Sequence, residues 1–400
     1  MLATRITEDL FQLAIGSMGL PMIILTVNTG SSSVRLAAFV NDDNELTELA
    51  NARHDLAAGE PGNILKEFVR ALGAGRIDVS AHRVVHGGTK FTASRLLDQE
   101  AEREIERLAP LAPLHNPVAL RWICETRKAL DTSIAQVAVF DTAFFSSLPE
   151  TARTYAIDHA LARKHGLRRY GFHGLAHQDM WRRWRQLKPG VPDGGRVISM
   201  QLGAGCSITA IDKGLPCDTS MGFSPLEGLV MATRSGDIDP ALVAFLQRQE
   251  GFTLGQVDRL LNEQSGLLGV SGISADIRQL LSSQDEHARL AVDLYCYRAR
   301  KYLGAYLAVL GGAEAIIFGG GVGENVPAVR ARILAGMTWC GIEIDSEKNN
   351  DAREVSCIST RTSRIEVWII PVNEAAVLAQ EAATVMAAKE NQSLEENPHE

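Results

Sequence analysis

Two acidic side chains follow apolar segments of the chain, in the position where open α/β sheets bind their ligands. Asp141 comes directly after the apolar run Ile134–Phe140, and Glu374 follows the run Val367–Ile370. A carboxylate at a strand end can align a substrate or hold Mg²⁺, which binds one or two carboxylates together with waters and phosphate oxygens. Each residue could equally cap the helix that follows it, so the pattern leaves both roles open.

Cationic side chains lie in three glycine-punctuated segments. Arg83 belongs to HRVVHGG, His173 to YGFHG and Arg234 to TRSGDIDP. An arginine beside glycines can hold a carboxylate or phosphate by two parallel hydrogen bonds, and flanking glycines let a ligand approach a histidine closely. We expect Asp237 and Asp239 to orient Arg234 in an electrostatic clamp. The alternatives are a surface arginine, a structural histidine and an exposed charged loop.

Three small-residue turns follow strands, and their backbone N–H groups could surround an anion. They are Asn28–Ser33 (NTGSSS), Gln201–Gly205 (QLGAG) and Gly319–Asn325 (GGGVGEN). None is a GxxxxGK[ST] or GxGxxG motif, so a P-loop and a dinucleotide-binding turn are both disfavoured. Asp276-Ile277-Arg278 is a weaker candidate for contacts to a base or ribose. Taken singly, each turn could be an ordinary hairpin turn.

These residue types together match the requirements of phosphoryl transfer. That reaction needs positioning, a metal ion and positive groups around the transferred phosphoryl group, with little covalent help from the protein. No Ser-His-Asp spacing and no HExxH motif points to a competing chemistry.

The elements that must position these residues alternate between short strands and helices, which indicates an α/β fold. Residues 24–39 and 197–211 share one pattern of strand, small-residue turn and strand, which predicts a duplicated domain with a cleft between the copies. The apolar stretch 303–323 carries Glu314 and repeated glycines. It therefore predicts a helix end at Gly311-Gly312, a buried strand and a turn rather than a membrane span.

Composition limits the class of protein. The 400 residues include 40 Lys plus Arg and 48 Asp plus Glu, a net charge of −8, with 46% hydrophobic and 22% charged residues. A net acidic chain without a basic block is a poor nucleic-acid binder. Six cysteines without a CxxC pair argue against a disulfide framework or zinc ribbon and favour the reduced cytoplasm.

The first 21 residues differ from the rest of the chain. Their apolar run is interrupted by Gln12 and Gly16, and Arg5 is followed by Glu8, which disfavours a secretory signal. We expect a short amphipathic extension, or translation that begins at Met18 or Met22.

From Met22 to Ala388 the chain resembles the acetate kinase family, within the superfamily of acetate and sugar kinases, Hsp70 and actin. The resemblance rests on NTGSSS, HRVVHGG, LAPLHNP, FDTAF, YGFHG, DTSMGFSPLEG, TRSGDIDP, GVGEN and PVNE. It implies two duplicated actin-like, ribonuclease H-like α/β domains around a central nucleotide and substrate cleft. The implied boundaries are an extension 1–21, a first domain 22–155 plus 376–400, and a nucleotide-binding domain 156–375.

The resemblance also implies a cytoplasmic homodimer that converts ATP and acetate to ADP and acetyl phosphate with Mg²⁺ (or Mn²⁺), acting on neither nucleic acid nor membrane. The implied catalytic residues are Asp141, His173, Arg234 and Arg83, and the implied magnesium residues are Asn28 and Glu374. Acetate would contact Arg83, with His115 on the phosphate side, in an apolar pocket of Val85, Leu114, Phe172 and Pro225. The implied nucleotide residues are Ser31, Ser33, Arg35, Gln201, Leu202, Gly203, Ala204, Gly205, Asp276, Ile277, Arg278, Gly321, Val322, Gly323, Glu324 and Asn325.

Four positions depart from the family pattern. Arg35 stands where relatives usually have Lys, Phe145 where His is usual, and Gln201 and Ala204 where the family has His and Asn. These changes fall on the phosphate side of the site, while the acyl side is intact. They keep open a pyrophosphate-dependent kinase and an actin-like regulatory module with little catalysis. The apolar acyl pocket separately keeps open a propionate or other short-chain acyl kinase.

Overall fold

The computed structural model describes residues 21–30, 33–43, 45–57, 59–73 and 76–396. These residues form two compact units, one running up to Phe144 and resuming at Asn373, the other spanning Phe145–Val372. Residues 1–20 of the expected extension 1–21 lie outside the described residues. No helix in the described part of the chain is long and apolar enough to cross a membrane.

The chain passes between the units at Phe144 and Val372, rather than after residues 155 and 375 as the sequence suggests. The segment that follows Phe144 belongs to the second unit because its side chains pack there. The Phe145 ring lies edge-on to His177, with centroids 6.2 Å apart. Further along, the Tyr155 hydroxyl hydrogen bonds to Glu227.

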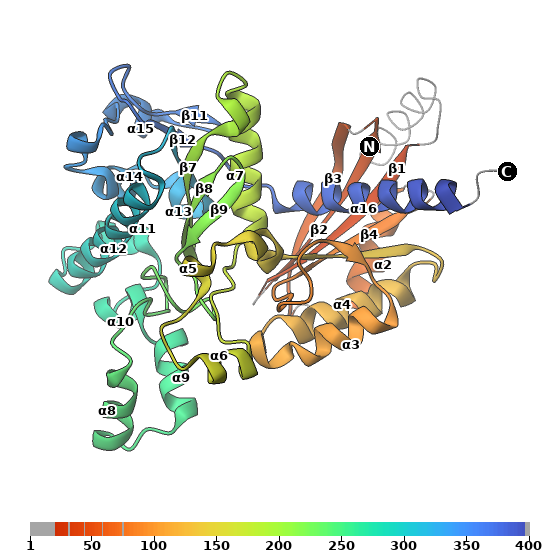
Figure 1. Ribbon diagram of the computed structural model, residues 1–400, viewed down its shortest axis with the longest axis horizontal. Helices are drawn as coiled ribbons and strands as arrows, with labels where there is room; N and C mark the ends of the chain where they lie inside the picture. Colours follow the sequence, from red (N-terminus) through yellow and green to blue (C-terminus); the bar gives the residue numbers. More distant parts are fainter. Residues whose placement is uncertain (1–20, 31–32, 44, 58, 74–75, 397–400) are drawn as a thin grey trace. The chain divides into compact units, whose positions relative to one another are not determined.

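The first unit contains a six-stranded mixed sheet in the order β3-β2-β1-β4-β6-β5 (Figure 1). Its elements are β1 (Met22–Thr29), β2 (Ser33–Asp42), β3 (Glu45–Asp55), α2 (Pro61–Leu72), β4 (Val79–Val84), β5 (Arg95–Leu96), α3 (Gln99–Arg107), α4 (Asn116–Ala129), β6 (Ala135–Phe140) and α16 (Glu374–Glu396). The pairs β1–β4 and β4–β6 are parallel, whereas β1–β2, β2–β3 and β5–β6 are antiparallel.

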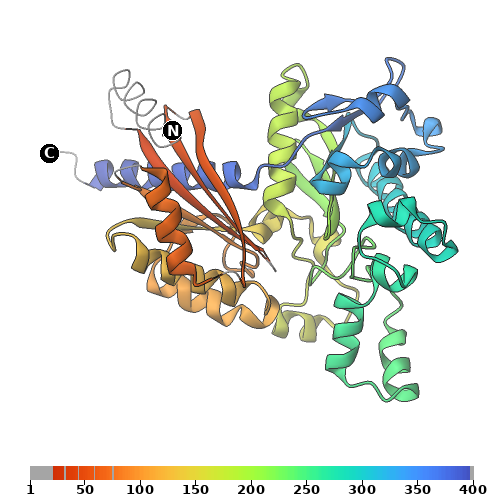
Figure 2. The same cartoon turned by 180° about the vertical axis from the view of Figure 1, so that it is seen from behind.

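Side-chain alternation along the strands explains the layers of this unit. On β1, Leu25 and Val27 join a core with Leu65 of α2 and Trp122 of α4, so one face of the sheet is covered by these helices. The long helix α16 buries Leu378 and packs along β1 and β4 (Figure 2). The C-terminal segment thereby completes the unit that the N-terminal strands begin.

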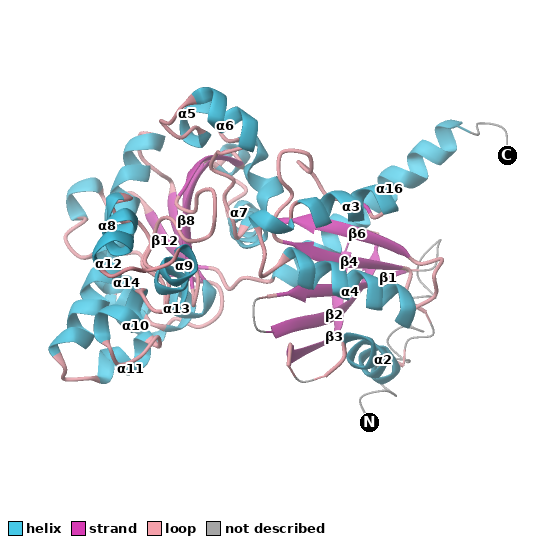
Figure 3. Cartoon of the chain, turned by 90° about the horizontal axis from the view of Figure 1, so that it is seen from below, coloured by secondary structure: helices cyan, strands magenta, loops and turns pink. Residues whose placement is uncertain are grey.

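The second unit repeats this topology. Its sheet has the order β9-β8-β7-β10-β12-β11, with β7–β10 and β10–β12 parallel and the remaining pairs antiparallel. The strand directions follow the same sequence as in the first unit, whose strands β3, β2, β1, β4 and β6 lie side by side in Figure 3. The strands are β7 (Arg196–Leu202), β8 (Cys206–Asp212), β9 (Leu215–Thr219), β10 (Ala315–Gly319), β11 (Ser356–Cys357) and β12 (Glu366–Ile369). The predicted duplication is confirmed.

Helices of the second unit cover its sheet and extend beyond it. They are α5 (Glu150–Arg153), α6 (His159–His165), α7 (Gly174–Leu187), α8 (Ala241–Gln249), α9 (Leu254–Glu263), α10 (Gly266–Ser271), α11 (Ile277–Ser282), α12 (Glu286–Leu310), α13 (Gly320–Asn325), α14 (Pro327–Leu334) and α15 (Ser346–Asp351). Met180 and Trp184 of α7 pack on Val197 and Ile317 of the sheet. The predicted helix stop is confirmed, because α12 ends at Gly311 in the left-handed conformation and β10 follows.

Gly320 opens α13 with a φ of +76°, and a Cβ there would lie 2.6 Å from the Leu202 carbonyl oxygen. We expect Gly320→Ala to lower the free energy of unfolding by about 1–3 kcal/mol, because both the backbone conformation and the close approach exclude a side chain. Gly304→Ala is the matched control, since a Cβ at this position within α12 meets no atom within 4 Å. That change should stabilise the helix by up to about 1 kcal/mol. Urea unfolding of both variants tests the pair, and equal midpoints would contradict the assignment.

Candidate active site

In the first unit, a buried ion pair joins the ends of two parallel strands. Arg83 of β4 donates from Nε to Oδ1 of Asp141 at 3.0 Å and from Nη2 to Oδ2 at 2.6 Å. Asp141, directly after β6, is 1% exposed. Asp141 is also the first residue of a 3-10 helix over Asp141–Ser147. Both oxygens of the Asp141 carboxylate accept hydrogen bonds from Arg83.

Asn28 and Glu374 complete this cluster from β1 and from the first turn of α16. Asn28 Nδ2 donates to Glu374 Oε2 at 2.7 Å, and Asn28 Oδ1 accepts from Arg83 Nη1 at 3.3 Å. Glu374 Oε2 lies 3.9 Å from Arg83 Nη1. The Nη1 edge of the guanidinium is therefore held more loosely than the edge that faces Asp141.

The electrostatics of the cluster reflect burial and opposite charge. Burial raises the pKa of Asp141, and the negative charge of Glu374 raises it further. The positive charge of Arg83 and, more weakly, that of His115 act in the opposite direction. Burial alone would lower the pKa of Arg83, but Asp141 and Glu374 raise it overall. Arg83 is thus a permanent cation held between two carboxylates.

This donor set fits a magnesium ion. Glu374, Asp141 and the Asn28 amide supply oxygen atoms, and Mg²⁺ prefers one or two carboxylates plus waters and phosphate oxygens to a cage made by protein alone. Among the described residues, no group of three or more His, Cys, Asp or Glu that could hold a metal occurs.

In the second unit, a partly buried arginine lies without an acidic partner. Arg234 donates from Nη1 to the Pro225 carbonyl at 3.2 Å and contacts the Met231 sulfur at 3.8 Å. Among the described residues no carboxylate forms an ion pair with it, and burial lowers its pKa. An uncompensated cation of this kind favours binding of an anion.

His173 lies beside this arginine at the start of α7, in the left-handed conformation with a φ of +59°. A Cβ built on Gly205 would be 3.4 Å from His173 Nε2 and 3.6 Å from Arg234 Nη1, so the two side chains approach the same point above Gly205. Two side-chain nitrogen atoms, His173 Nε2 and Arg234 Nη1, therefore lie on the side of the turn where Gly205 has no side chain.

The same turn borders a cavity of about 460 Å³. Its walls include Gly203, Ala204, Asp276, Ile277, Arg278, Gly321, Val322 and Asn325, which brings together the three segments expected to bind nucleotide. Ala232, Leu267, Ala275, Tyr295 and Val326 also line it and carry no sequence motif that would have identified them. A cavity of this size with mostly apolar walls suits a nucleoside.

Some expected nucleotide residues have other partners. Asp276 caps α11 and pairs with Arg278 at 2.8 Å. The Glu324 carboxylate accepts from the backbone N–H groups of Gly320 and Val372, so it fixes the turn that leads into α13. Arg35 is exposed on β2 opposite Asn28, Ser33 begins that strand, and Ser31 lies outside the described residues.

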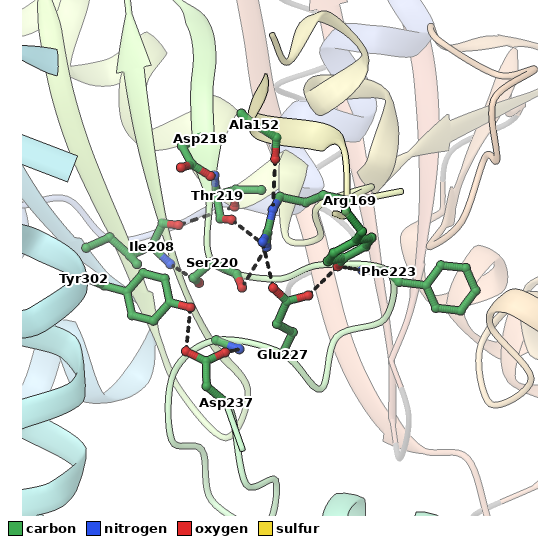
Figure 4. A network of polar contacts seen from close by, with 12 residues as sticks. Ala152, Arg169, Ile208, Asp218, Thr219, Ser220, Phe223, Glu227, Asp237 and Tyr302 are labelled. Carbon is green, nitrogen blue, oxygen red and sulfur yellow. Dashed lines mark hydrogen bonds and ion pairs between the residues drawn. The ribbon is translucent and has the colours of Figure 1, made fainter. Parts of the chain in front are cut away.

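The long loop that carries Pro225 and Arg234 is fixed by a network of hydrogen bonds (Figure 4). Arg169 donates to the carbonyl oxygens of Thr219 at 3.1 Å and Ser220 at 3.3 Å, and pairs with Glu227 at 2.6 Å. The Tyr155 hydroxyl binds the same carboxylate and accepts from the Phe223 N–H at 2.8 Å.

The expected role of Asp237 and Asp239 in orienting Arg234 is wrong. Asp237 accepts from the Gly228 N–H at 2.8 Å and from the Tyr302 hydroxyl at 2.8 Å, and pairs with Arg298 at 3.3 Å. Asp239 accepts from the Ala241 N–H at the start of α8. Both carboxylates hold the backbone of the loop, so they act on its shape and not on the guanidinium.

Comparisons with known proteins agree with this chemistry. The profile of the Acetokinase family matches residues 29–380. The chain belongs to this family. It is 48% identical over 321 residues to an acetate kinase of Chloroherpeton thalassium, covering 78% of this chain and 77% of the relative. It is 39% identical to an acetate kinase of Heliobacterium modesticaldum, covering 90% and 98%.

Solved structures of the acetokinase family share the fold. An acetate kinase from Porphyromonas gingivalis has a TM-score of 0.81 at 34% identity, covering 91% of this chain and all of that one. A propionate kinase from Francisella tularensis has a TM-score of 0.83 at 33% identity with the same coverage. The family makes this protein a phosphotransferase with a carboxyl group as acceptor.

The residues expected to bind the acyl group divide between the units. Val85 follows β4 and is buried, and Leu114 is 63% exposed just before α4, close in sequence to His115. In the second unit, Phe172 is buried and Pro225 accepts the hydrogen bond from Arg234. The structure leaves their role in an acyl pocket as a prediction.

Gly205→Ala tests the space between His173 and Arg234. The added methyl group would make only ordinary contacts at 3.4–3.6 Å, so we expect an unchanged melting temperature. Because the methyl group occupies the point that both nitrogens face, kcat should fall by about tenfold or more. Gly255→Ala on α9 is the control, since a Cβ there meets nothing within 4 Å. Full activity of Gly205→Ala would show that no reacting group enters this space.

Proposed function

We propose that the protein catalyses reversible, magnesium-dependent transfer of the terminal phosphoryl group of ATP to acetate, which gives acetyl phosphate and ADP. One observation carries the proposal: the turn Gly203–Gly205 lines the nucleoside-sized cavity with Gly203 and Ala204, and its third residue, Gly205, lies next to His173 and Arg234. A nucleotide in the cavity would thus direct its phosphates toward two nitrogen donors.

The chemistry asked of these residues is electrostatic. An acetate oxygen attacks the γ-phosphorus in line, the bond from that phosphorus to the β,γ-bridging oxygen breaks, and ADP leaves with the electron pair. Arg234 and His173 would donate hydrogen bonds to the equatorial oxygens of the transferring group, where negative charge is spread in the transition state.

The cluster in the first unit would orient the acceptor. Arg83 would hold the acetate carboxylate through its loosely bound Nη1 edge, and Asp141 would keep the guanidinium in place. Asn28 and Glu374 would hold Mg²⁺ (or Mn²⁺), with Asp141 ordering its waters. The ion, when bound, neutralises phosphate charge. His115 would act on the phosphate side.

The acyl substrate is acetate in this proposal, with propionate as the alternative. The small apolar set Val85, Leu114, Phe172 and Pro225 supports acetate, while the likeness to a propionate kinase supports the larger acid. Incubation with Mg-ATP, hydroxylamine and acetate, propionate or butyrate traps the acyl phosphate as a hydroxamate. We expect the highest kcat/KM with acetate, and absence of hydroxamate with all three acids would refute the kinase assignment.

The phosphoryl donor is ATP in this proposal, since the cavity beside Ala204 has room for a nucleoside. Gln201 and Ala204 nevertheless differ from the family pattern, so pyrophosphate is compared with ATP at equal concentration. Faster turnover with pyrophosphate than with ATP would show that pyrophosphate, and not ATP, is the phosphoryl donor. Binding of ATP without turnover, restored by Gln201→His with Ala204→Asn, would support the regulatory module instead.

Arg234→Ala tests the proposed clamp on the phosphoryl group. Loss of the guanidinium should lower kcat by on the order of a hundredfold or more, with a smaller change in the KM for ATP, because the contact strengthens in the transition state. Removing an uncompensated cation should leave the melting temperature unchanged or higher. A decrease in kcat of less than tenfold in a folded variant would show that Arg234 does not clamp the transferring phosphoryl group.

Location and assembly complete the proposal. All six cysteines are free, which supports a reducing compartment such as the cytoplasm. A homodimer is supported by exposed apolar side chains on the second unit, among them Leu290, Tyr297 and Trp339. Light scattering coupled to size exclusion measures the mass directly.

A further inference from the structure

A continuous chain of hydrogen bonds lies behind His173 in the second unit. His173 Nδ1 lies 2.9 Å from Ser207 Oγ, and the same hydroxyl lies 2.8 Å from His177 Nε2. His177 Nδ1 is in turn 2.7 Å from Ser199 Oγ. His177, Ser199 and Ser207 have no exposed surface. Water therefore does not compete for these hydrogen bonds.

Regular secondary structure aligns the four side chains. His173 precedes the first residue of α7 and His177 follows one turn later, with the His177 N–H donating to the His173 carbonyl at 3.0 Å. Ser199 and Ser207 lie on the paired strands β7 and β8. The Phe145 ring lies edge-on to His177, and a phenyl ring carries no nitrogen or oxygen that could bond to the imidazole. Both nitrogens of His177 thus bond to serine hydroxyls.

The number of available hydrogens limits this chain to two orderings. Burial, and secondarily His173, lowers the pKa of His177 well below its usual value, so that ring is neutral and carries one N–H. Each serine also has a single O–H. Either Ser199 donates to His177, His177 to Ser207 and Ser207 to His173 Nδ1, or every donor and acceptor is reversed.

The two orderings give His173 different properties at Nε2, the atom that faces the reaction space. In the first ordering Nδ1 accepts, so neutral His173 carries its hydrogen on Nε2 and can donate to a phosphoryl oxygen. In the second ordering neutral His173 presents a lone pair at Nε2. It would then donate from that atom only as an imidazolium.

The proposed role of His173 selects the first ordering, because only that ordering places an N–H at Nε2 of a neutral ring. His173 Nε2 approaches the same point above Gly205 as Arg234 Nη1, so a phosphoryl oxygen at that point could accept from both nitrogens. On the other side His173 faces the Ser207 hydroxyl of β8, and His177 faces Ser199 of β7. Cys206, next to Ser207, has a thiol whose pKa is raised by burial, so it stays neutral.

We propose that Ser199, His177 and Ser207 form an ordered relay that holds His173 in the tautomer with hydrogen on Nε2, so that the neutral imidazole donates to the transferring phosphoryl group. His177 and Ser207 are then positioning residues. This inference rests on the proposed role of His173 in phosphoryl transfer.

Ser207→Ala breaks the relay at its central atom, and the pH dependence of kcat is its readout. Without the hydroxyl, neutral His173 is free to place its hydrogen on Nδ1, so kcat at pH 8 should fall by about tenfold or more. The defect should shrink as the pH is lowered, because an imidazolium carries hydrogen on both nitrogens. Thr209→Val, which removes another buried hydroxyl from β8, should show neither effect.

Nitrogen-15 NMR of the histidine rings gives a second measurement on the wild-type protein, with His173→Asn used for assignment. We expect a protonated Nε2 and an unprotonated Nδ1 for His173 at pH 8. The opposite tautomer, or a loss in Ser207→Ala that is equal at all pH values, would overturn the relay. A wild-type kcat in His173→Asn would instead show that His173 has no role in phosphoryl transfer. Failure of the relay and failure of the proposed role of His173 are therefore distinguishable.

Discussion

A partly buried guanidinium without a carboxylate beside it is the constraint on which the active site depends. Desolvating a cation costs free energy unless opposite charge or hydrogen bonds offset it. For Arg234 the protein supplies one carbonyl and one sulfur, so much of that cost is left for a ligand to offset. The surrounding loop must therefore be held by other contacts, and Arg169, Glu227, Tyr155, Asp237 and Tyr302 provide them.

The duplicated fold contains two copies of one sheet, but the arginine charge is balanced differently in each unit. In the first unit Arg83 lies between Asp141 and Glu374, so its charge is balanced within the unit and its geometry is fixed by a bidentate pair. In the second unit Arg234 and His173 approach the same point above Gly205, and no carboxylate among the described residues pairs with Arg234. A carboxylate acceptor with a metal ion suits the first arrangement, and a phosphoryl group suits the second. The two copies of the sheet thus carry different electrostatic arrangements, which the proposed function assigns to different substrates.

Much of this organisation was predictable from sequence, because strands followed by small-residue turns are local patterns. The hairpins at 24–39 and 197–211, the helix stop at Gly311 and the pairing of topologies all follow from such patterns. The partners of Asp237 were not predictable, since Tyr302 and Arg298 are distant in sequence and belong to a helix that carries no motif. The relay was partly visible, because His173 and His177 have helical i, i+4 spacing. Ser199 and Ser207, however, are unremarkable strand residues until the two strands pair.

The proposed function requires Asp141 of the first unit and Arg234 of the second to act in the same reaction step. A double-mutant cycle on kcat/KM with Asp141→Asn and Arg234→Ala measures this directly, since residues that act as a unit have strongly non-additive effects. We expect the double variant to be little slower than the slower single variant. Single effects that multiply in the double variant, with all three variants folded, would show that the clusters act independently and would contradict the proposed function.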